Sequence, residues 1–465
     1  MIKVIDKPEE PPRISVRFAN TVFVLGCLLS ILISIYAVNR EYTLSITNSF
    51  YLICILFSGI SATLFGLGLR LKNNLKVNLS LILSVALIMT YMFELYLMFS
   101  LPDKRTKIEI IEDFRKNGVD AYLQIFPEVL INDPLTQNGF KTKKGNIFPL
   151  GAISNVTTIL KNEHGFHPII ENDEHGFNNP KGLYKEKEVN IVMTGDSFAE
   201  GNSVYADDNI QSILRKLGYK VLSIGMSGNG PLVELASIKE YAEFIKPKVL
   251  LWFYFENDIT ENLKNEKKSS FLMQYLNDEN FSQNLLTRQN EIDFVLKKYL
   301  NNHEIEYRKK QKKPRITFIS QSIINLIKLY ELRKRLNMSP TLSTVSFLPH
   351  YWIPTPTTPK KDFKKILEKA KKLVSSWGGE MYFVEIPWRT SFKNPTRHPL
   401  SEFVIESAHE LEIPVIDLYT ELSSNHPDPF FLYADHFTVE GYKLVAKIIA
   451  KRLNKDGIIS SDLNN

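Results

Sequence analysis

Three apolar segments dominate the first hundred residues of this 465-residue chain and constrain its fold more than any other feature. They cover about residues 21–38, 50–69 and 79–100. An α-helix needs about 20 apolar residues to cross the hydrocarbon core of a bilayer. The first segment has no small-residue cleavage site typical of a secretory signal peptide, and two further apolar segments follow it. We therefore predict a membrane anchor of three transmembrane helices over residues 1–100.

The basic residues that flank these segments predict their orientation. Seven lie in the N-terminal tail and in the loop between the second and third segments, whereas the loop between the first and second carries only Arg40. Because Lys-rich and Arg-rich short loops stay in the cytoplasm, we expect a cytoplasmic N-terminus and an extracytoplasmic domain beyond residue 101. Glu94 lies inside the third segment, near its outer end. Its carboxylate can reach interfacial water or make a functional contact, and the sequence leaves both open.

Charge and cysteine content exclude several classes of protein. The net charge of +6 is small for this length and is not concentrated in one basic domain, so nucleic acid is not an expected partner. The two cysteines, Cys27 and Cys54, both lie in the apolar segments, which excludes a disulfide framework or a cysteine-ligated zinc site elsewhere. Two E-H-G-F repeats contain His164 and His175, but no further ligands complete a metal site at fixed spacing. We expect no metal and no cofactor.

Beyond residue 188, short apolar stretches alternate with amphipathic ones. We expect strands at about 189–193, 220–224, 249–255, 380–386 and 414–418, and helices at 209–217, 362–375, 402–411 and 439–453. Strands that alternate with helices indicate a parallel sheet covered on both faces. The predicted fold is therefore a doubly wound α/β domain.

The chain accordingly divides into three predicted regions. Residues 1–100 form the membrane anchor, 101–188 a linker and accessory segment, and 189–465 the α/β domain. A polar, Lys-rich stretch at about 260–360 interrupts this domain and has helical periodicity over 290–300 and 316–336. We predict a helical insertion there, with its charged residues facing water.

Polar residues follow the predicted strands at the points where these strands end. Ser197 comes after the first strand, Gly228 after the second and Asn257 after the third, and the loop before the last helix contains His436. The carboxyl ends of parallel strands form the ligand-binding edge of an open α/β sheet, so we expect these residues to lie close together. A serine hydroxyl becomes a nucleophile when a neighbouring base takes its proton, and histidine has the pKa range for that base.

With these four blocks the chain resembles the SGNH (GDSL-type) hydrolase superfamily. The blocks read T-G-D-S-F, I-G-M-S-G-N-G-P, F-E-N-D and A-D-H-F-T-V-E-G-Y, and the resemblance covers about residues 189–453 without the insertion. It implies a flavodoxin-like SGNH fold with Ser197 as the nucleophile and His436 as the base. It also implies an oxyanion hole made by the backbone N–H groups of Ser197 and Gly228 and the side-chain amide of Asn257.

Two positions depart from the family pattern. Phe255 stands where the third block often has glycine. The last block usually spaces its acid and base as D-x-x-H, but Tyr433 occupies the position of the acid here, and the nearest carboxylate is Asp435, directly before His436. We favour Asp435 as the residue that orients the imidazole. Asp428 and a backbone carbonyl are the alternatives.

A membrane-anchored SGNH domain outside the cytoplasm resembles bacterial proteins that add or remove small acyl groups on cell-envelope glycans. The predicted function is an esterase or O-acyltransferase that acts on acyl esters, with acetyl favoured, of a polysaccharide through a seryl-acyl intermediate. A transferase would need a membrane partner that supplies the acyl group. The alternatives are a lipase-like or thioesterase-like hydrolase at the membrane surface, and a glycan-binding assembly protein that has lost its activity. The sequence does not distinguish hydrolysis from transfer.

Overall fold

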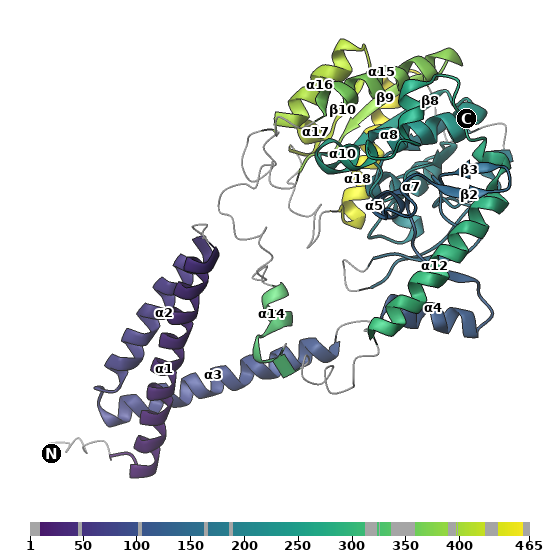
Figure 1. The fold of residues 1–465 in the computed structure, drawn as a ribbon. Coiled ribbons are helices and arrows are strands. Elements are labelled where there is room, and N and C mark those ends of the chain that lie inside the picture. The colour runs from purple at the N-terminus through teal and green to yellow at the C-terminus, as the bar shows by residue number, and fades with distance from the viewer. Residues whose placement is uncertain are drawn as a thin grey trace. The chain divides into compact units, whose positions relative to one another are not determined.

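The computed structural model describes residues 10–44, 49–100, 105–161, 166–185, 189–311, 323–324, 326–335, 359–388, 397, 399–423 and 436–458 (Figure 1). The chain divides into two compact units. One consists of Met1–Leu101 with Lys313–His350, and the other of Pro102–Lys312 with Tyr351–Asn465. After the roles that the sequence predicts for them, we call them the anchor unit and the catalytic unit, and we describe each by itself.

The anchor unit contains helices at all three predicted places. They are α1 (Arg13–Leu44), α2 (Ser49–Gly68) and α3 (Asn73–Ser100), and the short helix α14 (Tyr330–Arg335) belongs to the same unit. Among the described residues, two stretches are long and apolar enough to cross a membrane, Arg13–Asn39 and Asn73–Ser100. The apolar stretch of α2, Leu52–Gly68, is shorter. The prediction of three spans is therefore supported for two, while the described apolar stretch of α2 lies at the lower limit of length for a crossing.

Helices α1 and α2 approach each other closely because glycines face aromatic rings. A Cβ atom on Gly26 would lie 2.5 Å from the ring of Phe65, and one on Gly68 would lie 2.1 Å from the ring of Phe23. The Ser34 and Ser58 hydroxyls form a hydrogen bond of 2.6 Å between the same two helices. Small residues and hydroxyl pairs of this kind are typical of helix packing in membranes.

The catalytic unit is built on a five-stranded parallel sheet, which confirms the predicted α/β fold. Its strands are β6 (Ile191–Thr194), β7 (Val221–Ser223), β8 (Val249–Tyr254), β9 (Glu380–Glu385) and β10 (Val415–Asp417). They lie in the order β10-β9-β8-β6-β7, and all neighbours are parallel. The first strand along the chain thus lies between the second and the third. Ligands bind beside the carboxyl end of such a strand in open α/β sheets.

Alternate residues along the strands face two separate cores. Val192 and Trp252 belong to the first core, on one face of the sheet, and Met193 and Phe253 belong to the second core, on the other face. Helices on the first face are α8 (Pro231–Ser237), α15 (Lys360–Ser376) and α16 (Pro399–Glu410); those on the second are α7 (Ile210–Lys216), α17 (Leu418–Ser423) and α18 (Val439–Lys455). The period-two pattern of the strands therefore produces a sheet that is buried on both faces.

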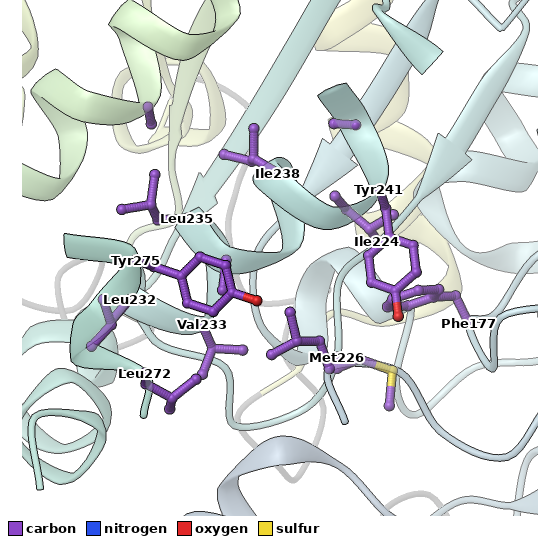
Figure 2. Packing of buried hydrophobic residues seen from close by; sticks show 14 of the residues in the cluster. Phe177, Ile224, Met226, Leu232, Val233, Leu235, Ile238, Tyr241, Leu272 and Tyr275 are labelled. Carbon is purple, nitrogen blue, oxygen red and sulfur yellow. The ribbon is translucent and has the colours of Figure 1, made fainter. Parts of the chain in front are cut away.

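The region predicted as a linker and accessory segment is folded onto the first core. Its elements are α4 (Lys107–Lys116), β1 (Ala121–Leu123), α5 (Pro127–Asn132), β2 (Phe140–Thr142), β3 (Gly145–Ile147), β4 (Thr157–Ile159) and β5 (Ile169–Glu171). Strands β1, β4 and β5 form a small sheet, and β2 pairs with β3. Phe148 and Phe177 are fully buried in the same cluster as Trp252. Figure 2 shows Phe177 beside Tyr241, whose ring lies 5.0 Å away.

The predicted insertion is not a single stretch exposed to water, because its two parts belong to different units and the first part contributes buried residues. Its first part contains α10 (Leu263–Glu266), α11 (Met273–Asn277) and α12 (Gln289–Gln311) in the catalytic unit. Tyr275 and Leu296 from this part are buried in the first core, and Figure 2 shows Tyr275 close to helix α8. Its later part, Lys313–His350, belongs to the anchor unit. The apolar faces of these helices, rather than their charges, determine where they pack.

Candidate active site

A sharp turn after β6 carries Ser197 to the carboxyl edge of the sheet. Gly195 has φ +148°, and a Cβ atom there would lie 2.8 Å from Cβ of Phe253 on β8. The side chain of Asp196 then caps the short helix α6 (Ser197–Glu200) by accepting a hydrogen bond from the N–H of Phe198 at 3.0 Å. Only glycine tolerates this backbone conformation at so close an approach. The turn therefore exposes the first residue of α6 beside the central strand.

His436 reaches the same place from the other end of the domain. Its Nε2 atom lies 2.6 Å from Oγ of Ser197, although 239 positions separate the two residues. The neighbouring Phe437 is fully buried, and its ring lies 4.9 Å from that of Phe198. Thr438 then caps α18 by accepting a hydrogen bond from the N–H of Gly441. The packing of Phe437 and the helix cap at Thr438 thus fix the backbone that directly follows His436.

The group that orients His436 stays a prediction. Asp435 and Asp428 lie outside the described residues. A carboxylate that the structure does describe close to the pair is that of Asp196, whose Oδ2 lies 3.5 Å from Oγ of Ser197. Burial raises the pKa of Asp196 to about 6, while the N–H of Phe198 and the charge of His436 act in the opposite direction. This carboxyl belongs to the turn itself, because it caps α6.

The predicted oxyanion residues lie at the ends of the two strands that flank β6. Gly228 follows β7 with φ +69°, and Asn257 follows β8. The Oδ1 atom of Asn257 has no hydrogen-bond partner among the described residues, while Asp258 accepts a hydrogen bond from the N–H of Phe255 at 2.8 Å. Sequence reasoning did not identify Asp258, which fixes the turn that carries Asn257. The role of Gly228 and Asn257 as oxyanion donors stays a prediction.

A buried carboxylate supports the loop that contains Gly228. Glu200 is 1% exposed, and it accepts hydrogen bonds from the N–H of Ser227 at 3.0 Å and from Nε2 of Gln124 at 2.8 Å. The Ser227 hydroxyl also donates to it. Burial raises the pKa of Glu200, and the hydrogen bonds from Ser227 and Gln124 lower it. No sequence motif identifies Glu200 or Gln124 as part of the site, because the packing of the accessory segment determines which residues they contact.

The accessory segment also places a carboxylate directly against Gly228. A Cβ atom on Gly228 would lie 2.1 Å from Oε2 of Glu128, which belongs to α5. Burial raises the pKa of Glu128, and the nearby charge of Glu261 raises it further. Glycine in the second block is thus required by close packing as well as by its positive φ.

The histidine repeat does not form a metal site in the described part of the chain. His175 packs edge-on against Tyr184, with ring centroids 4.5 Å apart, and its Nδ1 lies 3.3 Å from Oε1 of Gln289. His164 lies outside the described residues. Within the described ranges, no group of three or more His, Cys, Asp or Glu side chains could hold a metal ion.

Comparisons with known proteins found similar structures but no related sequences. No family model and no curated protein matches the chain. Similar solved structures include a lipase/acylhydrolase from Enterococcus faecalis (15% identity, 57% of this chain and 95% of the other, TM-score 0.31). They also include a GDSL-like lipase from Bacteroides thetaiotaomicron (11%, 58% and 90%, 0.31) and an acetyl-xylooligosaccharide esterase from Geobacillus (12%, 57% and 93%, 0.30).

Proposed function

We propose that the protein is a membrane-anchored serine esterase or O-acyltransferase of the SGNH type that acts on acyl esters of an extracytoplasmic polysaccharide. The observation that carries this proposal is the 2.6 Å contact between Ser197 Oγ and His436 Nε2. The pair lies at the carboxyl end of β6, between β7 and β8, where an open α/β sheet binds its ligands. A serine and a histidine in hydrogen-bond contact form the minimal unit for acyl transfer.

In the proposed reaction, Ser197 Oγ attacks the carbonyl carbon of the ester while His436 Nε2 takes the hydroxyl proton. The negative charge then forms on the carbonyl oxygen, and the N–H groups of Ser197 and Gly228 and the amide of Asn257 stabilise it. His436 returns the proton to the departing sugar hydroxyl, which leaves an acyl group on Ser197. Water or a second sugar hydroxyl then takes this acyl group. Removal of one oxyanion donor typically costs about 3 kcal/mol in the transition state.

Aromatic side chains near Ser197 support a carbohydrate substrate. Trp388 stacks on Phe255 with ring centroids 5.8 Å apart, and the ring of Phe255 lies 5.1 Å from that of Phe198. Trp388 and Phe255 both remain partly exposed. Exposed aromatic faces beside polar groups suit sugar rings, which present an apolar C–H face and polar hydroxyls. We infer that α1, α2 and α3 span the membrane, with the N-terminus in the cytoplasm and the catalytic unit outside.

The test is hydrolysis of p-nitrophenyl acetate by the purified full-length protein in detergent, with labelling by a fluorophosphonate probe. We expect Ser197→Ala and His436→Ala to abolish both hydrolysis and labelling, and mass spectrometry of the labelled wild type to identify Ser197. The matched controls are Ser376→Ala and His409→Ala, which change exposed residues of the same types on α15 and α16. Both controls should keep full activity.

Two results would contradict the proposal. A folded wild-type protein that neither hydrolyses the ester nor reacts with the probe would favour the glycan-binding alternative. Activity that survives in Ser197→Ala would locate the chemistry elsewhere. If the wild type reacts with the probe, assays with and without an oligosaccharide acceptor then separate hydrolysis from transfer, because only a transferase forms an acylated sugar.

A further inference from the structure

A carboxylate inside the third apolar helix holds an element from a distant part of the sequence. Glu94 on α3 is fully buried, and both of its carboxylate oxygens accept backbone hydrogen bonds. Oε1 accepts from the N–H of Glu331 and Oε2 from the N–H of Leu332, each at 2.8 Å. One turn earlier on α3, the hydroxyl of Tyr91 donates to the carbonyl of Ile327 at 3.2 Å. Figure 1 shows α14 lying against α3 within the anchor unit.

Helix α14 cannot cap its own N-terminus. It has six residues, and Leu329 precedes it with φ +48° and accepts a hydrogen bond from the N–H of Arg333 through its carbonyl. Leucine has no side-chain acceptor for the first N–H groups of a helix, and a helix this short is marginal by itself. Glu94 therefore supplies, from another helix, the acceptor that a serine or aspartate normally provides. Its negative charge also suits the positive end of the helix dipole.

The same contact explains why Glu94 occurs in an apolar helix. An ionisable side chain at this depth is costly unless a partner satisfies it. The two amide N–H groups of α14 satisfy both carboxylate oxygens. Of the two interpretations that the sequence left open, the structure thus favours a specific contact, because the carboxylate is fully covered.

The segment that Glu94 holds exposes apolar side chains next to the apolar surface of α3. Ile327 is 63% exposed and Ile323 51%. On α3 itself, Tyr96 and Phe99 are exposed near the same end of the helix. Large apolar side chains exposed on two adjoining elements indicate a lipid-facing surface rather than a water-facing one. The segment also contains four basic residues and one acidic residue: Lys328, Arg333, Lys334, Arg335 and Glu331.

We propose that Ile323, Ile324 and residues 326–335 form a membrane-surface element that Glu94 holds on α3, with its isoleucines among the acyl chains and with Lys328 and Arg333 at anionic lipid headgroups. This inference rests on the proposed membrane anchoring. Amphipathic segments with this combination bind the interface, and each basic residue near an anionic surface adds to the attraction. The chain leaves the catalytic unit at residue 312 and returns to it at residue 351, so the element gives that unit a second attachment to the membrane.

The test uses the full-length protein in nanodiscs of phosphatidylcholine, with or without phosphatidylglycerol. After Cys27→Ala and Cys54→Ala, an environment-sensitive fluorophore is attached through Ile327→Cys, and spin-labelled lipids are added as quenchers. We expect quenching at position 327 and none in a matched protein labelled through Ser376→Cys on α15. Glu94→Ala should abolish the quenching and shift the emission to that of an aqueous probe. Glu94→Gln, which keeps one acceptor oxygen, should reduce it partly.

The lipid charge and the activity provide independent readouts. Lys328→Ser should weaken quenching in discs with phosphatidylglycerol and leave it unchanged in pure phosphatidylcholine. Hydrolysis of a soluble ester should be unchanged in the Glu94 variants, which shows that the catalytic unit is folded. A probe at position 327 that is not quenched in the wild type, or one that is unaffected by Glu94→Ala, would overturn the proposal. A wild-type protein that shows quenching at position 327 but no hydrolysis would refute the proposed function and leave this proposal standing, because the two readouts depend on different units of the chain.

Discussion

Glu266 gives the sharpest prediction about the catalytic unit, because one buried carboxylate holds the start of a helix beside the site. Helix α8 begins at Pro231, and Gly230 before it has no side chain to cap it. Glu266, which is 1% exposed, accepts hydrogen bonds from the N–H of Gly230 at 2.6 Å and from the N–H of Leu232 at 2.9 Å. Replacing Glu266 with alanine leaves both buried donors without this acceptor.

The expected cost follows from these two donors. A buried donor that loses its partner costs about 1–3 kcal/mol, so Glu266→Ala should lower the free energy of unfolding by roughly 2–6 kcal/mol. Urea-induced unfolding of the full-length protein, followed by tryptophan fluorescence, measures this change. All four tryptophans lie beyond residue 251 and within the stretches assigned to the catalytic unit, so the signal reports on that unit.

Two further variants test the reasoning. Glu266→Gln keeps one acceptor oxygen and should cost less than Glu266→Ala. Glu279→Ala removes an exposed carboxylate that pairs with Lys372 and should leave the unfolding midpoint unchanged, since exposed ion pairs contribute little. If Glu266→Ala were as stable as Glu279→Ala, the hydrogen bonds to α8 would not stabilise the domain and the argument would fail.

Two other predictions concern the nucleophile turn and pH. In Gly195→Ala the new Cβ would lie 2.8 Å from Phe253, so the turn must shift and ester hydrolysis should fall by about 10²-fold; Gly182→Ala shares the positive φ but contacts nothing within 4 Å and should keep its activity. Burial raises the pKa of Asp173 and of Glu385 to about 7 each, whereas both carboxyls titrate near pH 4 in the unfolded chain. Their contribution to the free energy of unfolding is therefore fully present below about pH 4 and is lost as the pH rises through about 7. The urea midpoint should therefore fall between pH 5 and pH 8, and a rising midpoint would contradict these pKa values.

The parts of the fold that the sequence predicted well depend on local pattern. Residues 249–255 are apolar without interruption, and β8 forms there with all of its residues buried. Likewise, the position of Ser197 directly after a strand placed it at the carboxyl edge of the sheet. The insertion was predicted less well, because its many lysines obscured the apolar faces of α11 and α12 that pack on the core.

The sequence by itself determined the strand pattern, the parallel sheet and the position of Ser197 at its carboxyl edge, because each depends on local periodicity and on where strands end. Only the tertiary structure decided which carboxylates support these elements. Glu266 caps α8, Glu200 holds the loop before Gly228, and Glu94 holds α14 across 237 positions of sequence. A carboxylate that binds backbone N–H groups imposes no residue type on its partner, so such contacts leave no pattern in the sequence.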